Sequence, residues 1–155
     1  VSKNTVLTVL LCTGYQLTSL DVSKNTALTY LDCAVNKLTS LDVSNNTALT
    51  KLYCYTNQLT SLDVSKNTVL TVLLCDGNKL TSLDVSKNTD IAYLSCGATQ
   101  LTSLNLSNNT SLENLALASM PSLYKVCVWT MPFPPAGVTV ATIDSPNVYF
   151  TMECN

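Results

Sequence analysis

Five cysteines recur at a constant spacing of 21 residues, and thiols at a fixed interval could form disulfides, hold a metal ion or pack as small apolar groups. They are Cys12, Cys33, Cys54, Cys75 and Cys96. An odd number of thiols cannot all pair, and identical side chains stacked in parallel do not present the sulfur geometry of a relaxed bridge. A straight line of thiols does not converge on a tetrahedral metal ion, and the chain contains no His. We therefore predict a structural ladder of reduced, buried thiols and no metal site.

Aspartates recur at the same interval and could attract a cation, because carboxylates about 5 Å apart repel one another unless other groups offset the charge. The row contains Asp21, Asp42, Asp63 and Asp84, followed by Asn105. Calcium requires about six to eight oxygens in a cage, whereas a flat row supplies few oxygens per ion. We expect Ser and Thr hydroxyls and backbone amides to donate to these carboxylates, and we expect no cofactor.

The chain contains few residues that could act as a general acid or base. There is no His, no Ser or Cys has an evident base, and the two glutamates, Glu113 and Glu153, lie in the terminal region. A hydrolase needs one carboxylic acid in a dry pocket that faces a second carboxylate. Asp32 and Asp76 are two repeats apart, about 10 Å on an open sheet face. We expect a protein that is not an enzyme.

Charge and hydropathy exclude two classes of partner. The formal net charge is −2, and the eight basic residues are all Lys and are scattered along the chain, so no basic stripe can neutralise nucleic-acid phosphates. No run of about 18 consecutive apolar residues occurs, so we expect no membrane insertion. At 155 residues the chain is expected to build one elongated core.

The elements that position these side chains follow from the repeat itself. The consensus of the repeat is Leu-x-x-Leu-x-Cys-x-x-Asn-x-Leu-Thr-Ser-Leu-Asp-Val-Ser-x-Asn-Thr-x, and the units begin at Leu7, Leu28, Leu49, Leu70 and Ile91. Apolar and polar residues alternate in both halves of the unit, which is typical of strands with one buried face. The pattern predicts a β-rich solenoid in which two parallel sheets face each other, with very little helix.

Asparagines fall where each predicted strand ends. Asn36, Asn57 and Asn78 follow the first strand of their units, and a second row follows the second strand. Stacked side-chain amides can satisfy the backbone groups of each bend. We predict that both rows are structural, because buried backbone groups need such partners.

The repeat decays near residue 128, and we predict a solenoid over residues 1–128 and a capping segment over 129–155. Two β-prone stretches, 138–143 and 148–154, flank a turn sequence at 144–147 and predict a C-terminal β-hairpin. An alternative is that this hairpin begins a further domain. Cys127, expected to face outward, and Cys154 are candidates for a disulfide across the cap.

The start of the chain matches the middle of the next repeat. Residues 1–5, Val-Ser-Lys-Asn-Thr, recur at 22–26. We therefore expect a parent protein whose N-terminal part precedes Val1 and contains further repeats or a cap and a signal peptide.

These features resemble the leucine-rich repeat family over Leu7 to Val128, specifically the bacterial, internalin J-like class with 21-residue, cysteine-containing nested repeats. The resemblance implies a secreted or surface-attached binding module that is not an enzyme. Localisation at the cell surface or outside the cell is therefore expected.

Variation between the units is concentrated on the outward positions of the first strand. The predicted ligand-binding residues are Tyr30, Asp32, Lys51, Tyr53, Tyr55, Val72, Leu74, Asp76 and Tyr93. Exposed tyrosines beside apolar residues are typical of interaction sites, although cross-strand neighbours also stabilise sheets. The sequence predicts a monomer that binds a protein or glycan ligand through this face. The alternative is a structural spacer with no ligand of its own.

Overall fold

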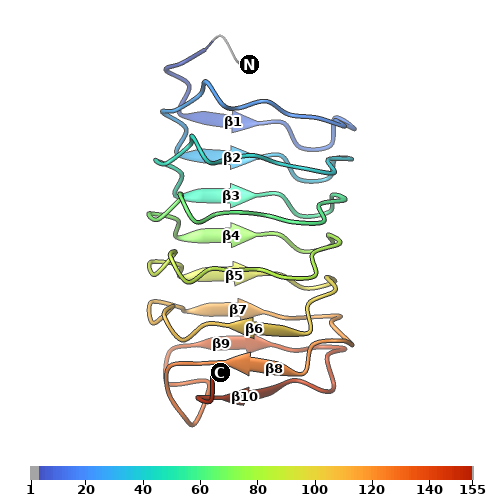
Figure 1. Ribbon diagram of the computed structural model, residues 1–155, viewed down its shortest axis with the longest axis vertical. Helices are drawn as coiled ribbons and strands as arrows, with labels where there is room; N and C mark the ends of the chain where they lie inside the picture. Colours follow the sequence, from blue (N-terminus) through green and yellow to red (C-terminus); the bar gives the residue numbers. More distant parts are fainter. Residues whose placement is uncertain (1–3, 155) are drawn as a thin grey trace.

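Each strand of the protein has only three residues, and its central side chain faces the core. The computed structural model describes residues 4–154 and contains ten such strands and no helix in that range. Residues pair with their counterparts one repeat later, for example Leu31 with Leu52 and Leu52 with Leu73. The result is a stack of coils with β1 near one end of the stack and β10 at the other (Figure 1).

Seven strands form one parallel sheet that runs the length of the stack. In spatial order they are β1 (Val9–Leu11), β2 (Tyr30–Asp32), β3 (Lys51–Tyr53), β4 (Val72–Leu74), β5 (Tyr93–Ser95), β7 (Asn114–Ala116) and β9 (Thr139–Ala141). The central leucines of β2 to β5 are fully buried. This sheet confirms the predicted solenoid and its register. No helix within residues 4–154 is long and apolar enough to cross a membrane.

The second sheet is much shorter than the sequence predicts. It contains only β6 (Ser103–Asn105), β8 (Lys125–Cys127) and β10 (Tyr149–Thr151), which run opposite to the strands of the long sheet (Figure 1). The preceding Ser-Leu-Asp segments, such as Ser61-Leu62-Asp63, bury their leucines without forming strands. Asp has low β-propensity and in-register carboxylates repel, whereas β6, β8 and β10 carry no carboxylate.

The prediction of a C-terminal β-hairpin is wrong. β9 pairs in parallel with β7, and β10 pairs in parallel with β8, so these strands belong to different sheets. Residues 144–147 therefore carry the chain from one sheet to the other instead of joining two paired strands of one hairpin. The buried Ser145 hydroxyl accepts a hydrogen bond from the Met120 amide and donates to the Leu117 carbonyl. Ser145 thus ties the last coil to the preceding one, in the manner of another repeat.

The first asparagine row links each coil to the one before it. Asn57 Nδ2 donates to the carbonyls of Cys33 and Cys54, each at 3.1 Å, and its Oδ1 accepts from the Leu38 amide at 3.0 Å. Asn36 and Asn78 repeat this arrangement with their own neighbours. These amides satisfy buried backbone groups at each bend, which explains why a polar residue occupies a buried position.

Cys127 and Cys154 form a disulfide with a Cα–Cα distance of 5.4 Å. Cys127 lies on the outer side of β8, but it is 3% exposed because the C-terminal segment covers it. The first residues, Val1 to Lys3, on which the prediction of a mid-repeat start rests, lie outside the described range.

Candidate ligand-binding face

The outer side of the seven-stranded sheet carries the residues that differ between coils. Because alternate residues of a strand point to opposite sides, the first and third residues of each strand point outward when the central one is buried. Seven of the predicted ligand-binding residues lie in β2 to β5, and the other two come two residues after β3 and β4. We call this set the tyrosine face: Tyr30, Asp32, Lys51, Tyr53, Tyr55, Val72, Leu74, Asp76 and Tyr93.

The tyrosines of this face form a cluster over β2 and β3. The ring centroids of Tyr30 and Tyr53 are 5.1 Å apart, and the rings meet edge to face. Partial desolvation raises the pKa of Tyr30, and the charge of Asp32 acts in the same direction. Tyr93, farther along the sheet, is 40% exposed. The cluster therefore offers aromatic surface with hydroxyl groups at its edges, which suits contact with a partner.

The apolar part of the face is less exposed than the sequence suggests. Leu11 in β1 is 60% exposed, but Val72 and Leu74 in β4 are half-buried between neighbouring strands. The side chains of β3 and β5 flank those of β4 in register. Tyr30, Tyr53 and Tyr55 are half-buried as well, whereas Tyr93 is exposed.

Asp76 is held in place by the next coil. Its Oδ1 atom accepts hydrogen bonds from the Ser95 hydroxyl and from the Gly97 amide, the latter at 3.2 Å. Asp32 accepts from the Ala34 amide two residues later, at 3.1 Å. Both carboxylates are half-buried. The tyrosine face thus contains two oriented anionic groups.

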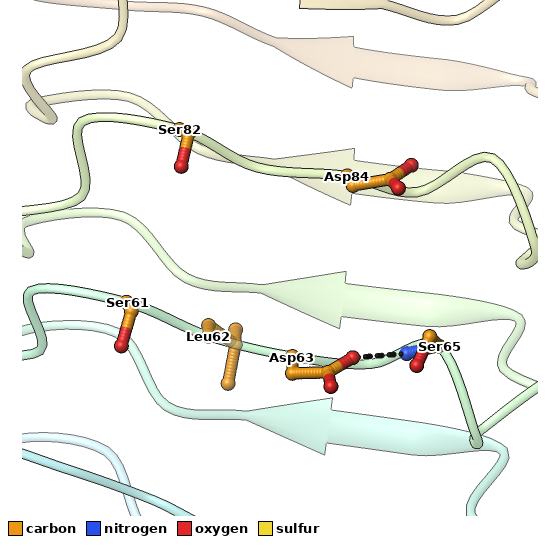
Figure 2. A pocket seen from close by; sticks show the side chains of 6 residues that line it. All are labelled: Ser61, Leu62, Asp63, Ser65, Ser82 and Asp84. Atoms are coloured by element: carbon orange, nitrogen blue, oxygen red, sulfur yellow. Dashed lines mark hydrogen bonds between the residues drawn. The ribbon is translucent and has the colours of Figure 1, made fainter.

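Up to Asn105, the opposite side of the solenoid is uniform and polar. Figure 2 shows one of its shallow grooves, about 420 Å³ in volume and lined by Ser61, Leu62, Asp63, Ser65, Ser82 and Asp84. A groove of the same volume follows one coil later. Repetition of one chemical pattern suggests a scaffold, because successive coils then offer few chemical differences by which a ligand could distinguish them.

The aspartate row on that side accepts hydrogen bonds from serines. Asp63 Oδ1 accepts from the Ser65 amide at 2.8 Å, and the other three aspartates do the same with the serine two residues later. Hydrogen bonds from the serine hydroxyl and backbone lower the pKa of all four carboxyls. Hydroxyl and backbone amide donors are the partners that the sequence analysis predicts for this row. Within the described residues, no group of three or more potential metal ligands converges.

The periodic cysteines follow the strands of the long sheet. Cys33, Cys54, Cys75 and Cys96 are buried, Cys12 is half-buried, and all five are free thiols. Burial raises the pKa of every one of them, to about 12 for Cys33 and Cys96. A buried thiol held in its protonated form is a poor nucleophile, so chemistry at these positions is suppressed.

Thiol counting is expected to give five free thiols in denaturant without reductant and seven after reduction. In the native protein only Cys12 should react readily, because the other four thiols are buried. Labelling with a chromogenic disulfide reagent, followed by mass mapping, measures both counts. Seven free thiols before reduction would contradict the disulfide.

Comparisons with known proteins agree with this geometry. The family model described as leucine rich repeats (2 copies) matches residues 26–67. The functional domain of InlJ from Listeria monocytogenes, which includes a cysteine ladder, is 27% identical with a TM-score of 0.55 over 95% of this chain. The chain therefore has the leucine-rich repeat solenoid fold of these proteins, and part of its sequence matches the leucine-rich repeat family.

Two further solved structures show the same leucine-rich repeat fold. A leucine-rich repeat protein of Leptospira interrogans is 23% identical with a TM-score of 0.79 over 97% of this chain. The internalin InlF from Listeria monocytogenes is 19% identical with a TM-score of 0.71 over 99% of this chain. This chain spans 46%, 40% and 50% of InlJ, the Leptospira protein and InlF, respectively. No curated protein matches the chain in sequence.

Sequence reasoning missed two features of this leucine-rich repeat solenoid. Thr99 stands 21 residues after Asn78 and continues the first ladder by donating to the Cys96 carbonyl at 2.8 Å. The repeat spacing could have identified it. The link from Ser95 and Gly97 to Asp76 joins variable positions of two coils, and no local pattern signals it.

Proposed function

We propose that this protein is a non-catalytic recognition module that binds a protein ligand through the tyrosine face. The observation that carries the proposal is the contrast between the two sides of the solenoid. One side varies from coil to coil and concentrates tyrosines, whereas the other repeats Ser and Asp in the four coils up to Asp84. A spacer has no need for such variation, but a recognition array uses it to define one binding site.

The internalin-like fold supports a binding role, since leucine-rich repeat domains of this kind are commonly protein-binding modules. Tyrosines combine large contact area with a polar tip and dominate many interface hot spots. We place the protein at the cell surface or outside the cell. The Cys127–Cys154 disulfide supports an oxidising compartment.

The test compares ligand capture by the wild type and by a Tyr53→Ala, Tyr55→Ala variant, using surface-protein extracts and a glycan array. We expect capture of a protein to fall at least tenfold, because aromatic hot-spot residues typically contribute about 2 kcal/mol or more each. The matched control is Tyr124→Ala, Tyr149→Ala, which removes two half-exposed tyrosines from other surfaces.

Three outcomes would overturn the proposal in different ways. An equal loss of ligand capture in both double variants would indicate non-specific binding by exposed aromatic side chains. Capture of glycans alone would replace the protein ligand with a carbohydrate. Absence of specific capture by the folded wild type would favour the spacer.

A further inference from the structure

Asp76 differs from the other carboxylates because two donors from a different coil fix its orientation. Ser95 and Gly97 both donate to Oδ1, and Ser95 is itself buried at 8% exposure. Oδ2 accepts no hydrogen bond from residues 4–154. The carboxylate is therefore a pre-oriented acceptor with one oxygen available to a ligand, and holding it in this position requires little further loss of side-chain entropy on binding.

The neighbours of Asp76 on the sheet are an aromatic residue on one side and small residues on the other. Tyr55 occupies the equivalent position of the preceding coil, and Gly97 and Ala118 occupy those of the next two. The Gly97 backbone packs so tightly that an added Cβ would lie 2.6 Å from the Ala118 carbonyl oxygen. The sequence therefore places no large side chain on that side of Asp76.

A second aspartate beside a tyrosine, like Asp76 beside Tyr55, lies two coils away. Asp32 is in register with Tyr53, which packs edge to face on Tyr30. The outward positions carry one cation, Lys51, against these two carboxylates, and no ion pair is formed by Asp32 or Asp76 within the described part of the chain. The tyrosine face is therefore an aromatic surface with unpaired negative charge.

We propose that the protein ligand of the tyrosine face places an arginine side chain on Asp76 beside Tyr55. A guanidinium group can donate to the free carboxylate oxygen and stack on a tyrosine ring at the same time, whereas a lysine ammonium has no plane to stack. This inference rests on the proposed function and specifies the chemistry of its partner.

The test uses ¹⁵N NMR of the full chain, with the Gly97 amide as a local reporter because it donates to Asp76. The probes are three blocked tripeptides, acetyl-Gly-Xaa-Gly-amide, in which Xaa is arginine, lysine or the uncharged arginine isostere citrulline. We expect the arginine peptide to shift the Gly97 and Tyr55 resonances saturably, the lysine peptide to bind more weakly and the citrulline peptide to cause no saturable shift.

Asp76→Asn keeps the shape of the side chain and removes its charge. It should weaken binding of the arginine peptide at least about tenfold, the usual effect of losing a charge-assisted hydrogen bond. Asp63→Asn removes an equal charge from the opposite side and should bind like the wild type. Equal binding by Asp76→Asn, no saturable shift in the wild type, or shifts centred on the aspartate row would overturn the inference.

Ligand capture separates this inference from the proposed function. Capture that requires Tyr53 and Tyr55 but is unchanged in Asp76→Asn would leave the binding module standing and contradict the arginine contact. Reduced capture by the Tyr53→Ala, Tyr55→Ala variant and by Asp76→Asn, restored in neither variant by added salt, supports both the binding module and the arginine contact. Capture unchanged in the tyrosine variant would contradict the proposed function itself.

Discussion

Replacing Asn57 with alanine is expected to lower the free energy of unfolding by about 2–4 kcal/mol, because a buried group left without a partner costs about 1–3 kcal/mol. The Leu38 amide is left without its acceptor, and the carbonyls of Cys33 and Cys54 each lose one of two asparagine donors. Denaturant unfolding followed by circular dichroism measures the change.

Two further variants make the Asn57 prediction specific to its hydrogen bonds. Asn57→Asp keeps the oxygen that accepts from Leu38 but turns a carboxylate oxygen toward two carbonyls, so it should destabilise the protein at neutral pH at least as much as alanine. Asn45→Ala changes an exposed asparagine of a neighbouring coil and should leave stability within about 0.5 kcal/mol of wild type. Similar losses in Asn45→Ala and Asn57→Ala would contradict the ladder.

Leu73→Ala is expected to lower the free energy of unfolding by about 3–5 kcal/mol, the range for a buried leucine whose removal leaves a cavity. Leu73 is fully buried in β4, the middle strand of the long sheet, and is in register with Leu52 and Leu94. Because each coil contacts only its neighbours, the defect weakens the two interfaces of this coil. A cavity here could also separate unfolding into two steps, visible as a lower m-value.

Leu74→Ala provides the matched control for the Leu73 prediction. The two leucines are adjacent in β4, but Leu74 points to the tyrosine face and is half-buried. Its truncation should cost about 1 kcal/mol or less, because part of the side chain is already in water. Equal destabilisation by the two substitutions would contradict the alternation of inward and outward residues in this strand.

The solenoid and its long sheet were predictable because their signals are local and repeated. A 21-residue period places equivalent residues in register, and alternation around Leu31 or Leu52 separates core from surface. The same reasoning identified Asn36, Asn57 and Asn78, whose amides do bond to backbone groups of adjacent coils.

The extent of the second sheet and the C-terminal hairpin were predicted wrongly, because alternation and turn residues do not determine which segments become partners. The Ser-Leu-Asp segments bury their leucines as expected, yet they lie beside one another without strand pairing. Likewise, the turn-forming residues 144–147 connect two strands that join different sheets. Strand partners depend on how the coils pack, which no short window of sequence contains.

The sequence by itself determined the architecture, the register of the long sheet and the set of outward residues, because a repeated local pattern has one consistent way to bury its apolar side chains. Only the tertiary structure decided which of those residues interact. The orientation of Asp76 depends on Ser95 and Gly97 from the next coil, and the edge-to-face packing of Tyr30 on Tyr53 depends on the spacing of two strands. These contacts join residues 19 to 23 positions apart, so they exist only once the coils have stacked.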